Sequence, residues 1–187
     1  MTSIDQWKET KYYKGIEKKT TQLELYIQKK SPVEILQLVS MANKVFGAEM
    51  EGIYQEIFQL DPRENTQHDG IRNGKKIEIK SARWHAIGDD CNWQHLEAEY
   101  DYEFALFTLV DFDRLKVWII SKKKLMGELR EKNIVMKQGQ QGWTTTKNKI
   151  EPYLTSISTV EDLDRFIASS ENRTSPPQTV VESSHPQ

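Results

Sequence analysis

The first sixty residues show the three- and four-residue spacing of apolar positions that predicts helices. Apolar side chains over residues 15–30 form one stripe. Ser31 followed by proline then predicts the start of a second helix, with Ser31 as its N-cap and Glu34 completing a capping box. A further amphipathic run covers residues 48–60. The pattern therefore predicts a helical N-terminal segment over residues 1–60.

The periodicity changes from 3.6 to 2 after this segment. Residues 75–80 alternate charged and β-branched side chains, which is the pattern of a half-buried strand. Asn73-Gly74 comes just before this run and is a strong signal for a two-residue hairpin turn. With that turn, Asp69 lies opposite Glu78, and directly opposed residues point to the same face of a hairpin. The sequence therefore predicts that these two carboxylates lie close together.

Two more apolar runs, residues 104–110 and 115–120, predict a second hairpin or two adjacent central strands. Residues 160–167 predict a short closing helix, capped by Ser158 or Thr159. Together these elements predict one mixed α+β (α/β) domain over residues 1–168. Its expected parts are a helical segment (1–60), a sheet core (61–124), and a closing loop and helix (125–168). Residues 169–187 are rich in Ser, Pro, Thr and Gln and are expected to form a disordered tail.

Composition narrows the class of protein. Hydrophobic residues make up 37% of 187 residues, enough for the core of one globular domain. The single cysteine, Cys91, excludes an intramolecular disulfide framework and favours a reducing compartment. Residues 1–11 carry no apolar or Arg-rich targeting stretch, so we expect a cytoplasmic protein. The longest mainly apolar run has seven residues, against ~20 for a bilayer-spanning helix, so no membrane association is expected.

The net charge of -2 excludes a uniformly basic surface, so nucleic-acid binding would need a local basic face. Candidate chemistry lies in the predicted hairpin. Glu78 and Lys80 are two residues apart and project from the same face of their strand, with Asp69 beside them. Two neighbouring carboxylates repel each other, and a divalent cation with oxygen ligands is the usual solution. Mg²⁺ held by Asp69 and Glu78 could activate a water for attack on a phosphodiester, with Lys80 offsetting the charge that develops.

An E-x-K sequence on an alternating strand is, by itself, far more often a solvated face than a site. Here it has supporting neighbours: an acidic residue placed opposite by a turn, a preceding helix rich in glutamate, and a polar and aromatic segment directly after the strand. Together these features favour a nuclease site over a solvated hairpin.

The hairpin segment resembles the PD-(D/E)XK nuclease superfamily, and within it the type II restriction endonucleases. The resemblance lies in the order of His68-Asp69, a short hairpin, Glu78-Ile79-Lys80 and then Ser81-Ala82-Arg83-Trp84. The resemblance covers residues 47–124. It implies a restriction-endonuclease-like core, a mixed sheet flanked by helices, with the two carboxylates and the lysine forming a Mg²⁺ site at one end. His68 stands where the motif name has proline, and only eight residues separate the two carboxylates.

The same family often carries another acidic residue on the helix before the hairpin. Glu49, Glu51 and Glu56 are the candidates, and we select Glu51 because small residues around it would permit close approach to the sheet. The alternative is an ordinary exposed helix residue.

DNA contacts are expected in the segments that come before and after residues 104–120 in the sequence. Arg83 and Gln94 offer phosphate and base-edge contacts in the segment after the motif strand. Lys122, Lys123 and Lys124 stand at a predicted helix start, where the dipole disfavours cations, so a phosphate contact would explain them. A solvated basic turn is the alternative reading of these lysines.

These expectations combine into a Mg²⁺-dependent endodeoxyribonuclease that hydrolyses duplex DNA, in the manner of a type II restriction endonuclease. A homodimer is expected because two-fold symmetry is the simplest way to cut both strands of a palindrome. A repair or junction nuclease of the same superfamily is one alternative. A non-catalytic nucleic-acid-binding protein with this fold is another.

Overall fold

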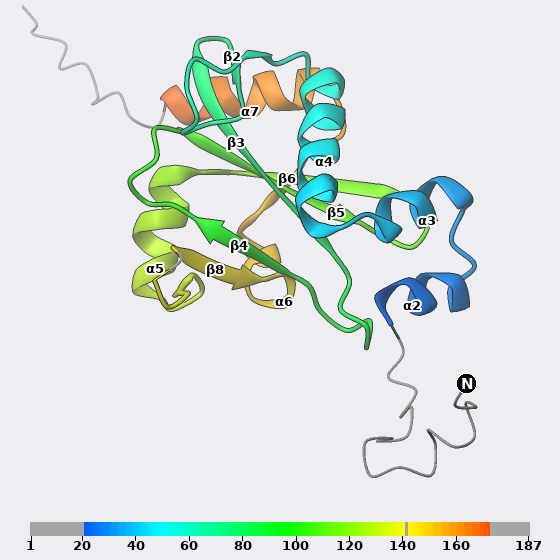
Figure 1. Ribbon diagram of the computed structural model, residues 1–187. Coiled ribbons are helices and arrows are strands. Elements are labelled where there is room, and N and C mark those ends of the chain that lie inside the picture. The colour runs from blue at the N-terminus through cyan, green and yellow to red at the C-terminus, as the bar shows by residue number, and fades with distance from the viewer. Residues whose placement is uncertain (1–20, 141, 173–187) are drawn as a thin grey trace, which may run out of the picture.

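A computed structural model describes residues 21–140 and 142–172 (Figure 1). The chain forms a mixed α+β fold with two sheets. The larger sheet has the order β1 (Asp61–Pro62), β2 (Gly70–Arg72), β3 (Lys75–Arg83), β5 (Phe104–Val110), β6 (Leu115–Ser121) and β9 (Thr155–Ser156). The smaller sheet has the order β4 (Asn92–Leu96), β8 (Trp143–Thr146) and β7 (Met136–Lys137).

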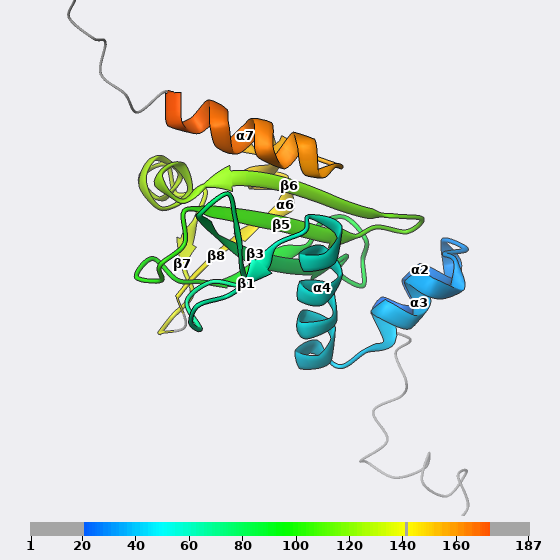
Figure 2. The same ribbon diagram turned by 90° about the horizontal axis from the view of Figure 1, so that it is seen from above.

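Helices flank this arrangement. They are α2 (Gln22–Gln28), α3 (Val33–Ser40), α4 (Asn43–Ile57), the π-helix η1 (Lys124–Glu128), α5 (Leu129–Glu131), α6 (Lys147–Ile150), the 3₁₀-helix η2 (Glu151–Tyr153) and α7 (Val160–Asn172). Figure 1 shows α4 and α7 on one side of the larger sheet and the smaller sheet, α5 and α6 on the other. Figure 2 shows the same layers from above, with α7 beside β6. The prediction of a mixed sheet flanked by helices, with a helical N-terminal segment, is confirmed.

The predicted hairpin has the predicted turn and register. Asn73 and Gly74 have φ angles of 52° and 73°, the left-handed conformation that a two-residue type I′ turn requires at both positions. Arg72 pairs with Lys75, and Gly70 with Ile77. The N–H of Asp69 continues the ladder by donating to the carbonyl of Ile77 at 2.8 Å. The turn chemistry therefore fixes which residues of the hairpin lie opposite each other.

The larger sheet is mixed because β3 lies between an antiparallel and a parallel neighbour. It pairs antiparallel with β2 and parallel with β5, and β5 and β6 form the predicted antiparallel pair. Gly70, at the start of β2, is needed for close approach, because a Cβ there would lie 2.8 Å from the Cβ of Leu60. The motif strand is thus an interior strand of the sheet, covered on both faces.

The helical segment differs from its prediction at three points. Helix α2 begins at Gln22, where Thr21 and Glu24 form a capping box, and the earlier part of the predicted run over residues 15–30 lies outside the described residues. Ser31 is not an N-cap, because α3 begins one residue later than expected, after Pro32, and has no side-chain cap. Helix α4 begins at Asn43 and contains Gly47, whereas the predicted run began only at residue 48, since tertiary packing outweighs the low helix propensity of one glycine.

The closing helix α7 is longer than expected. Thr159 is its cap: the N–H of Asp162 donates to Thr159 Oγ1 at 3.2 Å, and the N–H of Thr159 donates to Asp162 Oδ2 at 3.2 Å. The helix extends to Asn172, so the boundary predicted after residue 168 is too early. The rest of the predicted tail, residues 173–187, lies outside the described residues. None of the helices in the described ranges combines the length and the apolar character needed to cross a bilayer.

Candidate functional site

Asp69, Glu78 and Lys80 come together at the hairpin. Glu78 and Lys80 project from the same face of β3, and their Oε1 and Nζ atoms form an ion pair at 2.6 Å. Glu78 is 5% exposed and Asp69 is 8% exposed. This burial differs from the solvated face that an alternating strand usually presents.

Asp69 is held rigidly by three hydrogen bonds. Its N–H is bound in the ladder, as above, and its Oδ2 accepts the N–H of Ile79 at 2.7 Å. Its carbonyl accepts a hydrogen bond from Nε2 of Gln55 at 2.7 Å, which joins α4 to the hairpin. The carboxylate is therefore fixed against β3, and its Oδ1 atom makes none of these bonds.

The electrostatics reflect burial of like charges. Burial raises the pKa of Glu78 to about 7; Lys80 opposes this rise and Asp69 adds to it. Burial also raises the pKa of Asp69, against the hydrogen bond from Ile79. Burial lowers the pKa of Lys80, but the attraction and hydrogen bond of Glu78 together with the charges of Asp69 and Glu51 outweigh it, so the net direction is upward and the ammonium stays charged. Glu78 therefore takes up or releases its proton near neutral pH.

Glu51 lies at the edge of the same group. It is half-buried on α4, and its pKa is raised first by burial and then by the charge of Asp69. Glu49 and Glu56 on the same helix are exposed. The reason given for choosing Glu51 was wrong in detail: Gly47 and Gly52 do not mediate close contacts, because a Cβ at either position would meet nothing within 4 Å.

The donor set fits Mg²⁺ as a pair of carboxylates. Lys80 engages one oxygen of Glu78 and Ile79 engages one oxygen of Asp69, so each carboxylate retains an oxygen outside these two contacts. Mg²⁺ is commonly bound through one or two carboxylates with waters completing its shell. Within residues 21–140 and 142–172, no group of three or more His, Cys, Asp or Glu side chains is arranged to bind a metal ion. Glu51 therefore does not complete a three-carboxylate cluster.

Arg83 has a structural environment that the sequence did not predict. Its Nη1 donates to the carbonyls of Val39 and Met41 at 2.7 and 2.8 Å, and its Nη2 donates to Oδ1 of Asn43 at 2.6 Å. The guanidinium also lies 4.2 Å from the centroid of the Phe46 ring. These contacts stabilise the connection between α3 and α4, so Arg83 has little capacity left for a phosphate.

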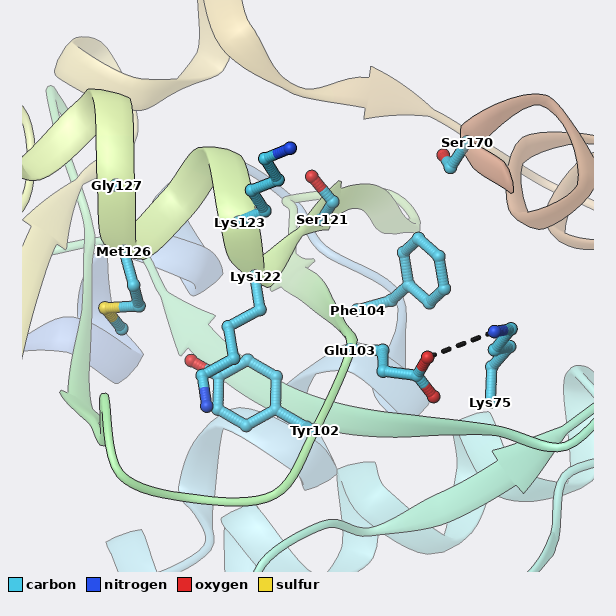
Figure 3. Close-up of a pocket in the computed structure, with 10 residues that line it drawn as sticks. All are labelled: Lys75, Tyr102, Glu103, Phe104, Ser121, Lys122, Lys123, Met126, Gly127 and Ser170. Atoms are coloured by element: carbon cyan, nitrogen blue, oxygen red, sulfur yellow. Dashed lines mark hydrogen bonds and ion pairs between the residues drawn. The ribbon is translucent and has the colours of Figure 1, made fainter. Parts of the chain in front are cut away.

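The three lysines after β6 do not form one basic patch. Nζ of Lys122 donates to the carbonyl of Tyr100 and lies 4.8 Å from the ring centroid of Tyr102. Nζ of Lys124 donates to the carbonyl of Tyr153 at 3.2 Å. Lys123 is exposed and points away from Lys122 (Figure 3). Only Lys123 is placed as a free phosphate-binding cation would be.

Figure 3 shows a cavity of about 540 Å³ next to these lysines. Phe104, Tyr102 and Met126 give it a largely apolar wall, and its one acidic residue, Glu103, is paired with Lys75 at 3.1 Å. The carboxylates of the hairpin do not line it. This cavity is therefore separate from the candidate site.

Two residues near the site, Gln55 and Arg63, were missed by sequence analysis, and the environment of a third, His68, was not predicted. Gln55 fixes Asp69, and its position one helical turn after Glu51 could have revealed it. Arg63 lines a cavity of about 430 Å³ together with Glu51 and lowers the pKa of both Glu51 and Asp69. His68 is fully buried, and its Nε2 accepts the N–H of Glu64 at 3.2 Å. No sequence signal pointed to Arg63, because no motif or periodic pattern includes it.

Gln94 is exposed on β4 and lines a polar cavity of about 440 Å³. The residues of β3 that line the same cavity, 81–83, directly follow Lys80 in the sequence. The structure therefore groups Asp69, Glu78, Lys80 and Glu51, and places Gln94 next to the strand that carries two of them.

Comparison of the chain with models of known protein families, with curated proteins and with solved structures finds no match.

Proposed function

We propose that this protein is a Mg²⁺-dependent endodeoxyribonuclease whose active site is Asp69, Glu78 and Lys80. One observation carries the proposal: two carboxylates and a lysine lie on one face of a hairpin, and both carboxylates are almost fully buried. A buried ion pair would account for Glu78 and Lys80 alone. It leaves Asp69 as a second buried carboxylate with Glu51 close by, and the charges of Lys80 and Arg63 offset the cost of burying these two groups only in part.

Burying a carboxylate whose charge is only partly offset costs free energy, so a structural role explains Asp69 poorly. A bound cation removes that cost, and the oxygens of Asp69 and Glu78 outside their present contacts would hold it. Mg²⁺ bound there would supply a polarised water and neutralise charge on a phosphodiester. Asp69 positions its carboxylate through the bond from Ile79, and Gln55 keeps α4 and Glu51 beside it.

Lys80 contributes a fixed positive charge next to the reacting phosphate. Its Nζ lies 2.6 Å from Oε1 of Glu78, and this ion pair orients the ammonium before substrate binds. Loss of the Glu78 proton near neutral pH prepares this carboxylate for metal binding. Within this function, a type II restriction endonuclease acting as a homodimer on duplex DNA is the form we favour, on the resemblance of the hairpin motif to that family.

The test is cleavage of supercoiled plasmid DNA by the full chain with Mg²⁺ and with EDTA. We expect nicked or linear product with Mg²⁺ alone, and loss of product in Glu78→Gln. Glu56→Gln is the matched control, because Glu56 is exposed on α4 and is not among the charges that shift the pKa of Asp69 or Glu78. Robust Mg²⁺-dependent cutting by Glu78→Gln would place the site elsewhere. Plasmid binding by the wild type without any cutting would instead support a non-catalytic nucleic-acid-binding protein.

A further inference from the structure

The polar cavity beside Lys80 has the position of a substrate subsite. It is lined by the N-terminal turn of α4, by the last three residues of β3 and by β4. Those β3 residues directly follow Lys80. Gly47 and Glu51 are four residues apart on α4 and therefore lie on the same side of that helix. A nucleic-acid strand with a phosphate at Lys80 would therefore extend into this cavity.

The described side chains that line this cavity include no lysine or arginine that is free to bind a phosphate. Arg83 is the only Lys or Arg among the described residues that line it, and three carbonyl or amide oxygens already engage its guanidinium. Gln94 and His95 are exposed, and their side chains make no hydrogen bond within the described part of the chain. Amide and imidazole groups offer both donors and acceptors, which base edges require, whereas phosphates are bound chiefly by cations.

An irregularity in β4 turns Gln94 and His95 outward together. Pairing between β4 and β8 shifts register between Trp93 and Leu96, and His95 has a φ of 56°. In a regular strand, one of two successive side chains would face the core. Here the residues on either side, Trp93 and Leu96, are buried, while both central side chains are exposed. Bulges of this kind redirect side chains and are common next to active sites.

Gly47 leaves the cavity open on the α4 side. A Cβ at this position would meet nothing within 4 Å. The absence of a side chain on an interior helical residue costs roughly 1 kcal/mol relative to alanine. An unfilled space beside a polar wall is therefore retained against local helix stability.

We propose that this cavity binds the bases next to the scissile phosphate and recognises their edges through Gln94 and His95. This inference rests on the proposed function, and it assigns sequence selectivity to β4 rather than to Arg83. A glutamine that binds an adenine edge bidentately contributes about 1–3 kcal/mol, or roughly 5- to 150-fold in discrimination. Neutral contacts of this kind leave the salt dependence of binding unchanged.

The first experiment is selection of a randomised DNA duplex by the full chain in metal-free buffer, where the proposed hydrolysis cannot proceed. We expect the wild type to enrich a defined motif, and Gln94→Ala and His95→Ala each to lose preference at particular positions. The slope of binding against salt should stay the same. A wild type without preference, variants with the wild-type motif, or a slope reduced by about one in either variant would overturn the inference.

The second experiment fills the cavity. Gly47→Leu adds a side chain inside it, and Gly127→Leu is the matched control, because Gly127 also has open space at its Cβ but lines the larger cavity of Figure 3. Each variant replaces a helical glycine with a good helix former, so both should fold. We expect at least about tenfold weaker DNA binding for Gly47→Leu alone. Equal binding by the two variants would exclude this cavity from the interface.

Both measurements report binding, so they are separate from the plasmid assay. If the motif is lost on Gln94→Ala but the wild type never cuts plasmid, base recognition by this cavity stands and the nuclease proposal fails. If plasmid is cut with Mg²⁺ but no motif is enriched, the nuclease proposal stands and the inference fails.

Discussion

The two faces of β3 bury very different chemistry. Ile77 and Ile79 enter an apolar core formed with α3, α4 and α7. Glu78 projects from the opposite face, toward the side covered by β4, and is almost as buried as its two neighbours. Successive residues of one strand therefore lie in an apolar core and in a charged cluster, and they are buried to nearly the same degree.

The isoleucine face stabilises this fold, whereas burial of the carboxylate face costs free energy. Burial of an isoleucine side chain contributes about 1.5–3 kcal/mol, whereas burial of a carboxylate is unfavourable unless it is paired. Lys80 pairs with Glu78, but Asp69 depends mainly on the N–H of Ile79. The isoleucine face should therefore control stability, and the carboxylate face should control activity.

The largest expected effect is on cleavage. Asp69→Asn, Glu78→Gln and Lys80→Ala should each reduce plasmid cleavage about 10³-fold or more without unfolding the protein, because the three groups act as a unit. Asn at position 69 keeps an acceptor for the N–H of Ile79, whereas Asp69→Ala would leave that buried N–H without a partner. Combining Asp69→Asn with Lys80→Ala should add little to either single loss, as measured by initial rates. Additive losses would show that these residues act independently.

The next effect is on stability alone. Ile77→Ala should lower the free energy of unfolding by about 2–5 kcal/mol, since Ile77 is fully buried and the change leaves a cavity. Cleavage per folded molecule should remain near that of the wild type. Urea denaturation together with the plasmid assay below the unfolding midpoint checks both parts. A selective loss of cleavage would mean that the two faces are not separable.

Removal of the lysine should destabilise the metal-free protein. Lys80→Ala leaves Glu78 buried without its countercharge, so at pH 8 we expect the free energy of unfolding to fall by about 2 kcal/mol. This value is below the range for breaking a fully buried pair because the Lys80 side chain is 22% exposed. The loss should shrink at pH 6, where Glu78 takes up a proton. Thermal or urea unfolding at both pH values measures the difference. Equal losses at both would indicate that Lys80 stabilises the fold through packing.

The raised pKa of Glu78 sets the direction of a pH effect. A carboxyl with a folded pKa of about 7 and an unfolded pKa near 4.3 binds more protons when folded, so its stabilising contribution is lost as pH rises through about 5 to 7. Metal-free wild type should lose on the order of 2 kcal/mol over that interval. Glu78→Gln should be flatter and more stable at pH 8. A wild type that gains stability from pH 5 to 7 would contradict the raised pKa.

The smallest effect concerns the lysines after β6. Because Lys122 and Lys124 bind backbone carbonyls and Lys123 alone is exposed, changing all three to alanine should lower the slope of log binding constant against log salt by about one. Titrations of DNA binding at several salt concentrations provide the slope. A reduction near three would mean that all three lysines bind phosphate.

Local chemistry determined the hairpin. Asn73 and Gly74 tolerate positive φ, alternation identified the strand that follows, and these two signals together specify the pairing of Gly70 with Ile77. The order of strands β5 and β6 and the cap at Thr159 also follow from short-range patterns. Such features depend on residues within a few positions of one another, so the sequence contains them directly.

Long-range packing decided the rest. Burial of Glu78, and with it a pKa near 7, requires the neighbouring strand β5 and the face covered by β4, and no local pattern distinguishes that face from a solvated one. The contacts of Arg83 with the end of α3, and the register shift that exposes Gln94 with His95, involve partners that are distant in sequence. The sequence by itself determined which groups share a face, and only the tertiary structure decided their solvent exposure and partners, because desolvation depends on neighbours brought together by folding.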